Sequence, residues 1–444
     1  MQSLNSHTKY PRVLIIGSPF NNKTGGGITM SNLFQGWPKD RLALASSANL
    51  LLEADTTICE NYFQLGYKGK LHPFPLNIVL NKVNCGPVKL SKTIKPDSLK
   101  VLSNSGRYKR FYGILRFFLE FVGVFNILYK LKITKEYIKW IRDFNPDIIY
   151  SQLASFDSIR MVSTVARVLG KPVALHFMDD WISTINKPGL LFFYWKNRFE
   201  NELLSLINIS AVLMSIGEAM SIEYYKRYKR NFIPFHNPID TNRWLPFSRK
   251  NWSFSGEFKI LYAGRVGQGM KNSIIDVARV VNSLTHNYKD IVFEILSPDI
   301  DELKGKVYLN DNVVWIKPLQ YSELPEKFSG SDLLILPIDF DEKSIKFLKY
   351  SFQTKISEYM ISGTPILVYA PKETSTASYA IKDGWAYVVT ERSDLSLENA
   401  ILDLYSKYSI RKELGERAIQ LAINKEDSDI VREKFRDCLA QKMN

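Results

Sequence analysis

Short apolar runs alternate with helical patterns along almost the whole of this 444-residue chain. Most runs are too short for helices and are rich in Val, Ile and Leu, which is typical of strands buried on both faces of a sheet. Parallel strands need a crossover between them, and that crossover is usually a helix. The alternation therefore predicts an α/β fold built on parallel sheets.

The same pattern occurs in both halves of the chain. In the first half, strands are predicted at Val13–Ile16, Ile148–Tyr150, Val173–His176 and Ala211–Ser215, and helices at Ile28–Trp37, Lys135–Phe144, Asp157–Leu169 and Glu218–Arg227. In the second half, strands are predicted at Ile260–Ala263, Ile291–Leu296, Val313–Ile316, Leu333–Pro337, Ile366–Tyr369 and Ala386–Val389, and helices at Ser273–Leu284, Tyr321–Phe328 and Gln353–Ile361.

The length of the chain is too great for one ordinary core, so we expect more than one domain. The segment Asn237–Pro246, followed by the polar stretch Ser248–Glu257, is typical of a linker. We therefore predict an N-terminal domain at residues 1–245 and a second domain at residues 246–425.

Residues 61–133 interrupt the alternation. Prolines make the first part of this segment typical of a loop, whereas the second part, Phe111–Leu131, is strongly apolar but carries Arg116, Glu120 and Asn126. At about 100° per residue, these and other polar or small residues form one stripe, which argues against a membrane-spanning helix. Two interpretations remain open: the wide apolar face is buried in the first domain, or it contacts a membrane surface.

The formal net charge of +14 at pH 7 calls for an acidic partner. Residues 105–145 hold nine Lys or Arg against three Asp or Glu, a local excess of +6. If the apolar helix meets a membrane, this excess favours an anionic bilayer. Nucleic acid is a poorer partner, because no Arg-rich helix or stacking platform accompanies the charge.

The segment Ile260–Lys271 contains the clearest candidate for a binding site. Its apolar strand is followed by Gly264, by the cations Arg265 and Lys271, and by further glycines in the same loop. In an open α/β sheet, ligands bind outside the carboxyl ends of the strands, where such a loop lies. Cations on a glycine loop suit a diphosphate, although a solvated basic loop would have the same composition.

A second candidate segment, Tyr350–Pro365, predicts a short helix that Gly363 ends. Lys355 and Glu358 can face away from the core, and Thr354 lies just before them. The first turn of a helix offers free N–H groups to an anion, and a glutamate can accept hydrogen bonds from sugar hydroxyls. A surface helix with a routine Lys–Glu face is the alternative.

Taken together, these motifs resemble those of the retaining GT-B glycosyltransferases of family 4. The matching segments are Gly264-Arg265 with Lys271, Glu358-Tyr-Met-Ile-Ser-Gly363-Thr-Pro365, the glycine loop Gly25-Gly-Gly27-Ile-Thr, Ser215-Ile-Gly-Glu-Ala-Met220 and His236-Asn237-Pro-Ile-Asp240. The likeness covers most of the chain. One departure is Tyr350, which stands where the family often has a second glutamate, so the contacts to the donor sugar are in doubt.

The resemblance implies a GT-B fold, in which two Rossmann-like domains face each other across a cleft and a C-terminal helix, residues 426–444, returns to the first domain. It implies a hexosyltransferase-like enzyme that moves a sugar from a UDP- or GDP-sugar to a glycan or lipid-linked acceptor with retention of configuration, in polysaccharide or glycoconjugate biosynthesis. Donor binding would involve Gly26, Gly27, Arg265, Lys271, Thr354, Lys355 and Glu358.

Lys171–Trp181 is the candidate acceptor side. His176, Asp179 and Asp180 follow a predicted strand, and in the resembling enzymes a histidine or acid at this place lies near the reacting sugar. A lone histidine is more often structural, but the adjoining pair of acids favours a catalytic role. Arg265 and Lys271 would complete the catalytic set by stabilising the departing diphosphate.

No metal or cofactor is expected. The histidines form no zinc-binding spacing, and the Asp-x-Asp pairs at Asp299 and Asp339 are short patterns that occur by chance. Three scattered cysteines are typical of a cytoplasmic protein, which would contact the inner face of the membrane peripherally if at all. The alternative function is a non-catalytic nucleotide-sugar-binding or membrane-surface subunit of a glycosylation assembly.

Overall fold

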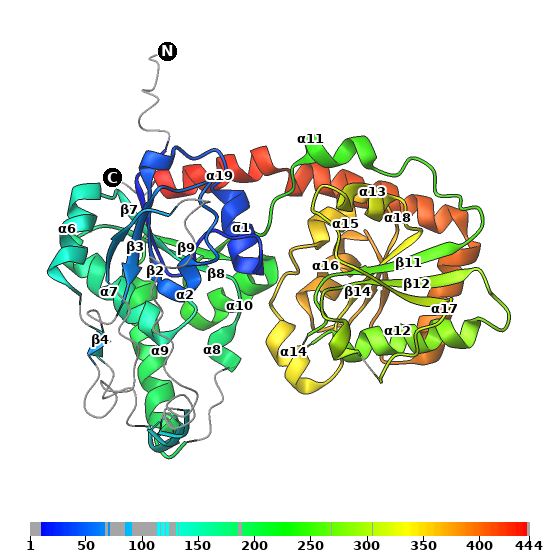
Figure 1. Ribbon diagram of the computed structural model, residues 1–444, viewed down its shortest axis with the longest axis horizontal. Coiled ribbons are helices and arrows are strands. Elements are labelled where there is room, and N and C mark those ends of the chain that lie inside the picture. The colour runs from blue at the N-terminus through cyan, green and yellow to red at the C-terminus, as the bar shows by residue number, and fades with distance from the viewer. Residues whose placement is uncertain are drawn as a thin grey trace, which may run out of the picture. The chain divides into compact units, whose positions relative to one another are not determined.

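The computed structural model describes residues 10–66, 70–71, 85–90, 113–115, 117–119, 121–123, 130–131, 133–184, 189–267, 269–303 and 305–441. The chain divides into two compact units (Figure 1). Unit 1 comprises residues 1–235 and 432–444, and unit 2 comprises residues 236–431. Each unit is an α/β domain with its own sheet, as the alternating pattern predicts.

Unit 1 is built on an eight-stranded sheet in the order β10-β9-β8-β7-β1-β2-β3-β5. Its strands are β1 (Val13–Ile16), β2 (Leu42–Ser47), β3 (Asn61–Leu65), β5 (Gly86–Val88), β7 (Ile148–Ser151), β8 (Val173–Phe177), β9 (Val212–Ser215) and β10 (Ile233–Pro234). Only β5 runs antiparallel to its neighbour among these pairs. The two residue pairs β4 (Lys70–Leu71) and β6 (Lys130–Leu131) form a separate ladder.

The helices of unit 1 follow its strands as crossovers. They are α1 (Gly25–Leu33), α2 (Ala48–Leu51), α6 (Lys135–Phe144), α7 (Phe156–Leu169), α8 (Trp181–Thr184), α9 (Phe192–Ile209) and α10 (Glu218–Tyr228). Ser155 caps α7 in a reciprocal box with Ser158, and Gly170 ends the helix in the left-handed conformation.

The C-terminal helix α19 (Ser428–Ala440) contributes its later residues to unit 1. Phe435 packs edge-on against Phe34 with ring centroids 5.0 Å apart, and it also contacts Tyr150 and Phe235. Arg432 Nε donates to Asn32 O at 2.7 Å, so α19 lies beside the end of α1 (Figure 1). Its aromatic anchor therefore becomes part of the core of unit 1.

Unit 2 has a six-stranded parallel sheet in the order β13-β12-β11-β14-β15-β16. Its strands are β11 (Phe258–Ala263), β12 (Ile291–Leu296), β13 (Val313–Ile316), β14 (Leu333–Pro337), β15 (Ile366–Tyr369) and β16 (Tyr387–Val389). Its helices are α11 (Thr241–Trp244), α12 (Lys271–Leu284), α13 (Leu324–Ser329), α14 (Glu342–Leu348), α15 (Ile356–Ser362), α16 (Ser375–Asp383), α17 (Asp394–Ser406) and α18 (Tyr408–Leu421).

Alternate residues of these strands enter two separate cores, because successive side chains of a strand point to opposite faces of the sheet. Leu261, Leu334 and Val368 belong to one hydrophobic cluster. Ile260 and Leu333, their neighbours along the strands, belong to the other. Both faces are thus buried, which explains the nearly continuous apolar runs in the sequence.

Two predictions of organisation need correction. Residues 61–133 were predicted to interrupt the alternation from their start, but residues 61–65 form β3. This strand pairs with β2, and β5 pairs with β3. The predicted linker at Asn237–Pro246 is not a free connection, since it contains α11, whose Trp244 is buried in a core cluster of unit 2. Unit 2 therefore begins at His236 rather than near residue 246.

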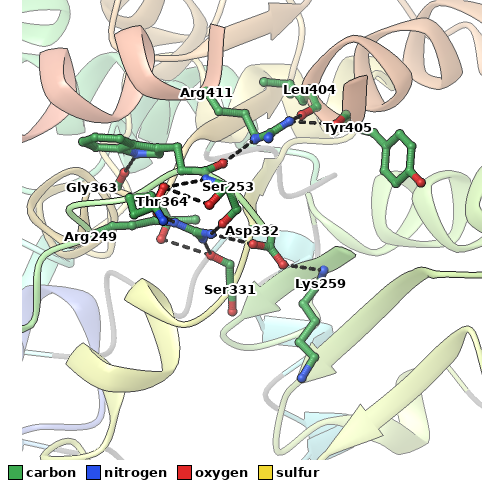
Figure 2. A network of polar contacts seen from close by, with 12 residues as sticks. Arg249, Ser253, Lys259, Ser331, Asp332, Gly363, Thr364, Leu404, Tyr405 and Arg411 are labelled. Atoms are coloured by element: carbon green, nitrogen blue, oxygen red, sulfur yellow. Dashed lines mark hydrogen bonds and ion pairs between the residues drawn. The ribbon is translucent and has the colours of Figure 1, made fainter. Parts of the chain in front are cut away.

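A polar network fixes the segment that leads into β11 (Figure 2). Arg249 Nη2 donates to Asp332 Oδ1 at 2.6 Å, and Asp332 Oδ2 accepts from the backbone N–H of Lys259 at 3.0 Å. Arg411 Nε donates to Trp252 O at 2.9 Å. The side chains of Arg249 and Asp332 are only 11% and 8% exposed, so each charge depends on the other.

We expect Arg249→Met to lower the free energy of unfolding of unit 2 by about 3–5 kcal/mol, because it leaves the Asp332 carboxylate buried without a cation. Urea denaturation measures the loss. Lys250→Met is the matched control, since Lys250 is exposed. Asp332→Asn added to Arg249→Met should recover part of the stability; equal losses in Arg249→Met and Lys250→Met would contradict the role of the pair.

Candidate functional site

The sheet of unit 2 has a topological switch point at β11 and β14. From β11 the chain proceeds to β12 and β13 on one side, and it then returns to β14 and continues to β15 and β16 on the other. In such sheets, ligands bind in the crevice outside the carboxyl ends of the two central strands. Gly264 directly follows β11, so the predicted glycine loop begins at this crevice.

Gly264 and Lys355 are brought together there. Lys355 Nζ donates to Ala263 O at 2.7 Å and lies 4.3 Å from the centroid of the Tyr262 ring. A Cβ atom at Gly264 would lie 2.5 Å from Lys355 Nζ, and the φ of Gly264 is +145°. Only glycine therefore fits at this position. The two sequence motifs meet through this contact.

The partial burial of Lys355 makes its charge sensitive to pH. Desolvation lowers the pKa of Lys355 to about 7, and the Glu358 carboxylate opposes that shift. Desolvation also raises the pKa of Glu358 to about 7, while a hydrogen bond from Tyr321 and the charges of Lys355 and Arg243 act in the opposite direction. An ammonium in this state has lost much of its water and gains strongly from an anionic ligand.

Arg265 and Lys271, the two cations of the loop that follows β11, have different surroundings. Lys271 Nζ lies 2.7 Å from Glu302 Oε2, and this hydrogen bond raises the pKa of Lys271. Arg265 is exposed, and its guanidinium has no ion pair or hydrogen bond among the described residues. A cavity of ≈480 Å³ adjoins the loop and is lined by residues that include Gly267, Gly269, Lys271 and Asn272.

Aspartates of both Asp-x-Asp pairs accept hydrogen bonds from backbone N–H groups. Asp339 Oδ1 accepts from Ser273 N at 2.7 Å in the first turn of α12, and Asp341 caps α14 through Ser344 N at 3.0 Å. Asp299 Oδ2 accepts from Val266 N at 3.1 Å. No group of three or more His, Cys, Asp or Glu side chains suited to a metal occurs in the part of the chain that the structure describes.

A cluster of polar side chains around Glu426, close to the segment before Lys355, was not predicted from the sequence. Glu426 is 1% exposed and lies 2.8 Å from His236 Nε2, and it also accepts hydrogen bonds from Ser357 Oγ and Tyr379 OH. Asn237 Nδ2 donates to Thr354 O at 3.1 Å. These contacts fix the backbone just before Lys355. The only sequence signal was the His-Asn-Pro motif, which gave no indication of its glutamate partner.

In unit 1, Gly25–Gly27, which were predicted as a glycine loop, form the first turn of α1 and lie near the carboxyl end of β7. Gln152, which follows β7, donates from Nε2 to Gly26 O at 3.2 Å. A Cβ atom at Gly27 would lie 2.2 Å from Asn21 Nδ2, so the packing of Asn21 requires glycine there. Thr24 caps α1 by accepting from Gly27 N. Gly26 and Gly27 are thus constrained by the fold, and their role in donor binding stays a prediction.

His176 does not have the surroundings of a catalytic group. Its ring is fully buried; Nε2 lies 2.9 Å from Phe235 O and Nδ1 lies 2.8 Å from Tyr150 OH. A carbonyl only accepts, so Nε2 carries the proton and Nδ1 accepts from Tyr150. Burial lowers the pKa of His176 to about 4. These surroundings are those of a neutral, structural histidine, and the catalytic role expected for His176 stays an untested prediction.

The two acids after His176 differ from each other. Asp180 is buried and accepts from Tyr224 OH at 2.9 Å, and it pairs with Arg227 at 3.0 Å. These contacts give Asp180 a structural role, and the catalytic role expected for it stays a prediction. Asp179 is exposed, and its catalytic role stays a prediction.

Unit 1 also contains a cavity of ≈210 Å³ near the carboxyl ends of β1, β2 and β3. It is lined by Ile16, Gly17, Ser46, Ser47, Leu50, Leu65, Gly66, Cys85, Thr134, Tyr137, Ser155, Asp157, Ser158 and Met161. The hydroxyl groups of Ser46 and Tyr137 are buried and have no hydrogen-bond partner among the residues that the structure describes. Such groups are costly unless a ligand or water satisfies them. The lining contains no lysine or arginine, so an uncharged ligand fits it best.

Part of this chain matches a known protein family in sequence, and the whole chain is similar in structure to solved proteins. Residues 257–407 match the family model described as "Glycosyl transferases group 1". No curated protein sequence matches the chain. The chain is similar in structure to HepE of Anabaena in complex with UDP and glucose, at 12% identity and a TM-score of 0.59, over 97% of this chain and 100% of that one.

Two further solved structures have the same TM-score of 0.59. Sucrose-phosphate synthase from Thermosynechococcus elongatus is 11% identical over 95% of this chain and 97% of its own. A glycosyltransferase from Rickettsia africae is 11% identical over 98% and 99%. The fold is that of the GT-B glycosyltransferases, as predicted. The residues that match the group 1 model lie within unit 2 and include Arg265, Lys271 and Glu358.

We expect acid to destabilise unit 1 through His176. The folded chain has a pKa of about 4 at His176, against 6.5 for an ordinary histidine, so only the unfolded chain gains a proton between these values. The stabilisation is complete above about pH 6.5 and falls by roughly 3 kcal/mol towards pH 4. His176→Gln should remove most of this pH dependence of the free energy of unfolding, as measured by urea denaturation. The exposed control His286→Gln should retain it. The same pH dependence in both variants would contradict the assignment.

Proposed function

We propose that this protein transfers a sugar from a nucleotide-sugar donor to a glycan or lipid-linked acceptor. The observation that carries the proposal is the contact of Lys355 with Ala263 O beside Gly264, which assembles a cationic crevice at the switch point of the group 1 domain. The structural neighbours include complexes with UDP and with UDP-2-fluoro glucose, which supports a UDP-sugar over a GDP-sugar.

In the proposed reaction, the acceptor hydroxyl oxygen bonds to the anomeric carbon while the bond to the diphosphate oxygen breaks. The leaving diphosphate gains negative charge and takes up the proton of the acceptor. Arg265, Lys271 and Lys355 would stabilise that charge, which is a large term when donors are positioned beforehand. No metal ion is required for this role.

We further propose retention of configuration by attack on the face that the diphosphate leaves. Three carboxylates near the loop 264–271 support this route, because none of the three stands free as a nucleophile. Asp299 and Asp339 accept hydrogen bonds from backbone N–H groups, and Glu302 pairs with Lys271. Inversion at the anomeric carbon, seen by NMR of the product, would contradict this step.

The acceptor is proposed to bind unit 1 through uncharged hydroxyl groups. The cavity with the unpartnered hydroxyls of Ser46 and Tyr137 supports this choice, since a sugar can satisfy both groups and its apolar face suits Leu65 and Met161. An acceptor of this kind belongs to cell-surface polysaccharide or glycoconjugate biosynthesis.

A second candidate function is a nucleotide-sugar-binding subunit without catalysis. Tyr350, in the place of the second glutamate of related enzymes, supports it. The purified chain discriminates the two: release of UDP from UDP-sugars supports the enzyme, and tight binding without release supports the subunit.

Arg265→Ala and Lys271→Ala should each reduce donor turnover by about 10²-fold or more, because each removes a positive charge that stabilises the leaving group. UDP release measures turnover, and circular dichroism checks that the fold is intact. Lys289→Ala is the control, since Lys289 is an exposed lysine just before the amino end of β12, whereas the loop 264–271 follows the carboxyl end of β11. Turnover near that of the wild type in both test variants would overturn the assigned role.

A further inference from the structure

An apolar tip extends from unit 1. We define it as the exposed side chains of Ile114, Phe117, Phe118, Phe121, Leu190, Leu191, Phe193 and Tyr194. The exposed fractions of Phe193, Ile114 and Phe117 are 77%, 71% and 70%. Soluble proteins seldom leave so many large apolar side chains together in water without a partner for them.

The four members between residues 114 and 121 share one helical face. The described residues from Gly113 to Val122 are helical, and positions spaced by three or four residues lie on one side of a helix. Ile114, Phe117, Phe118 and Phe121 have this spacing and are all exposed. Burial in the first domain, one of the two interpretations of the sequence, is therefore wrong for this face.

The two segments of the apolar tip are fixed to one another. Leu190 N donates to Phe121 O at 2.9 Å, and the indole of Trp195 donates to Gly123 O. A Cβ atom at Gly123 would lie 2.6 Å from Leu191 Cβ, so glycine allows this close approach. Four of its members, Leu190, Leu191, Phe193 and Tyr194, lie at the start of α9, and in Figure 1 this helix extends away from the sheet of unit 1.

Positive charge borders the apolar tip. Lys196 and Arg198 are exposed in the next turn of α9; Arg198 Nη1 donates to Tyr194 OH at 3.1 Å, and Arg198 Nε pairs with Glu202 Oε1 at 3.1 Å. In the sequence, residues 105–145, which include Ile114 to Phe121, have a net excess of +6. Apolar and aromatic side chains with a basic border match the interface of an anionic bilayer, where rings sit among head groups and cations meet phosphates.

We propose that the apolar tip inserts into the surface of an anionic lipid bilayer and anchors unit 1 there. None of the helices that the structure describes is long and apolar enough to cross a membrane, so the contact would be interfacial. This anchoring goes beyond the proposed sugar transfer and does not depend on it.

Flotation of the full chain with vesicles tests the proposal. The wild type should float with vesicles of phosphatidylcholine mixed with phosphatidylglycerol, and less with phosphatidylcholine alone. Phe117→Ser with Phe193→Ser should weaken the binding by at least about tenfold, because two anchoring rings are lost. The control is Tyr308→Ser with Leu395→Ser, which removes two equally exposed apolar side chains from unit 2 and should float like the wild type.

Charge is tested by Lys196→Gln with Arg198→Gln, which should lower binding to the anionic vesicles and bring it towards the level seen with phosphatidylcholine. Equal flotation of the wild type and the Phe117→Ser, Phe193→Ser variant would overturn the proposal. So would a wild type that does not float but forms a dimer that the same variant abolishes, since a second copy would then cover the apolar tip. We expect donor turnover in detergent-free buffer to be unchanged in the Phe117→Ser, Phe193→Ser variant. Unchanged turnover would show that a loss of flotation does not come from a failure of the enzyme.

Discussion

The hydrogen bond from the Lys355 ammonium to the carbonyl of Ala263 is the interaction on which the candidate site depends. It joins two segments that are 92 residues apart in sequence, and it requires Gly264 to lack a side chain. Because the ammonium has lost much of its water, the pKa of Lys355 falls to about 7. An anionic ligand beside it would stabilise the charged form. The same bond places Lys355 at the switch point, where an α/β sheet leaves its crevice open.

The rest of unit 2 holds this contact in place. The polar network of Arg249 and Asp332 fixes the chain before β11, and the hydrogen bond from Asn237 to Thr354 O fixes the backbone before Lys355. The nearby aspartates Asp299, Asp339 and Asp341 are engaged with backbone N–H groups, whereas Glu302 is paired with Lys271. Arg265 and Lys355 therefore have no ion pair with any of these four carboxylates. The structure thus offers positive charge to a diphosphate and relies on rigid elements to position it.

Much of this arrangement could be predicted from the sequence. The parallel strands of unit 2 are buried on both faces, and four of them have the predicted bounds, because continuous apolar runs identify such strands well. The strand β2 was missed, since its alanines and the leucines after it also suit a helix, and its pairing with β1 decides the outcome. The burial of His176 was missed as well, because it depends on Tyr150 and Phe235, which only the folded sheet brings near. Spacing along the chain identified Lys355 as a site residue, but its contact with Ala263 needed the tertiary structure.

The measurement that tests the central claim most directly is hydrogen–deuterium exchange of the full chain with and without UDP. The account predicts that UDP slows exchange of the backbone N–H groups in two segments of unit 2, the loop 264–271 and residues 352–358, because both border the Lys355 contact. Gly264→Ala should abolish this protection while the exchange of β12 and β15 stays unchanged. Protection confined to unit 1, or protection that survives in Gly264→Ala, would contradict the account.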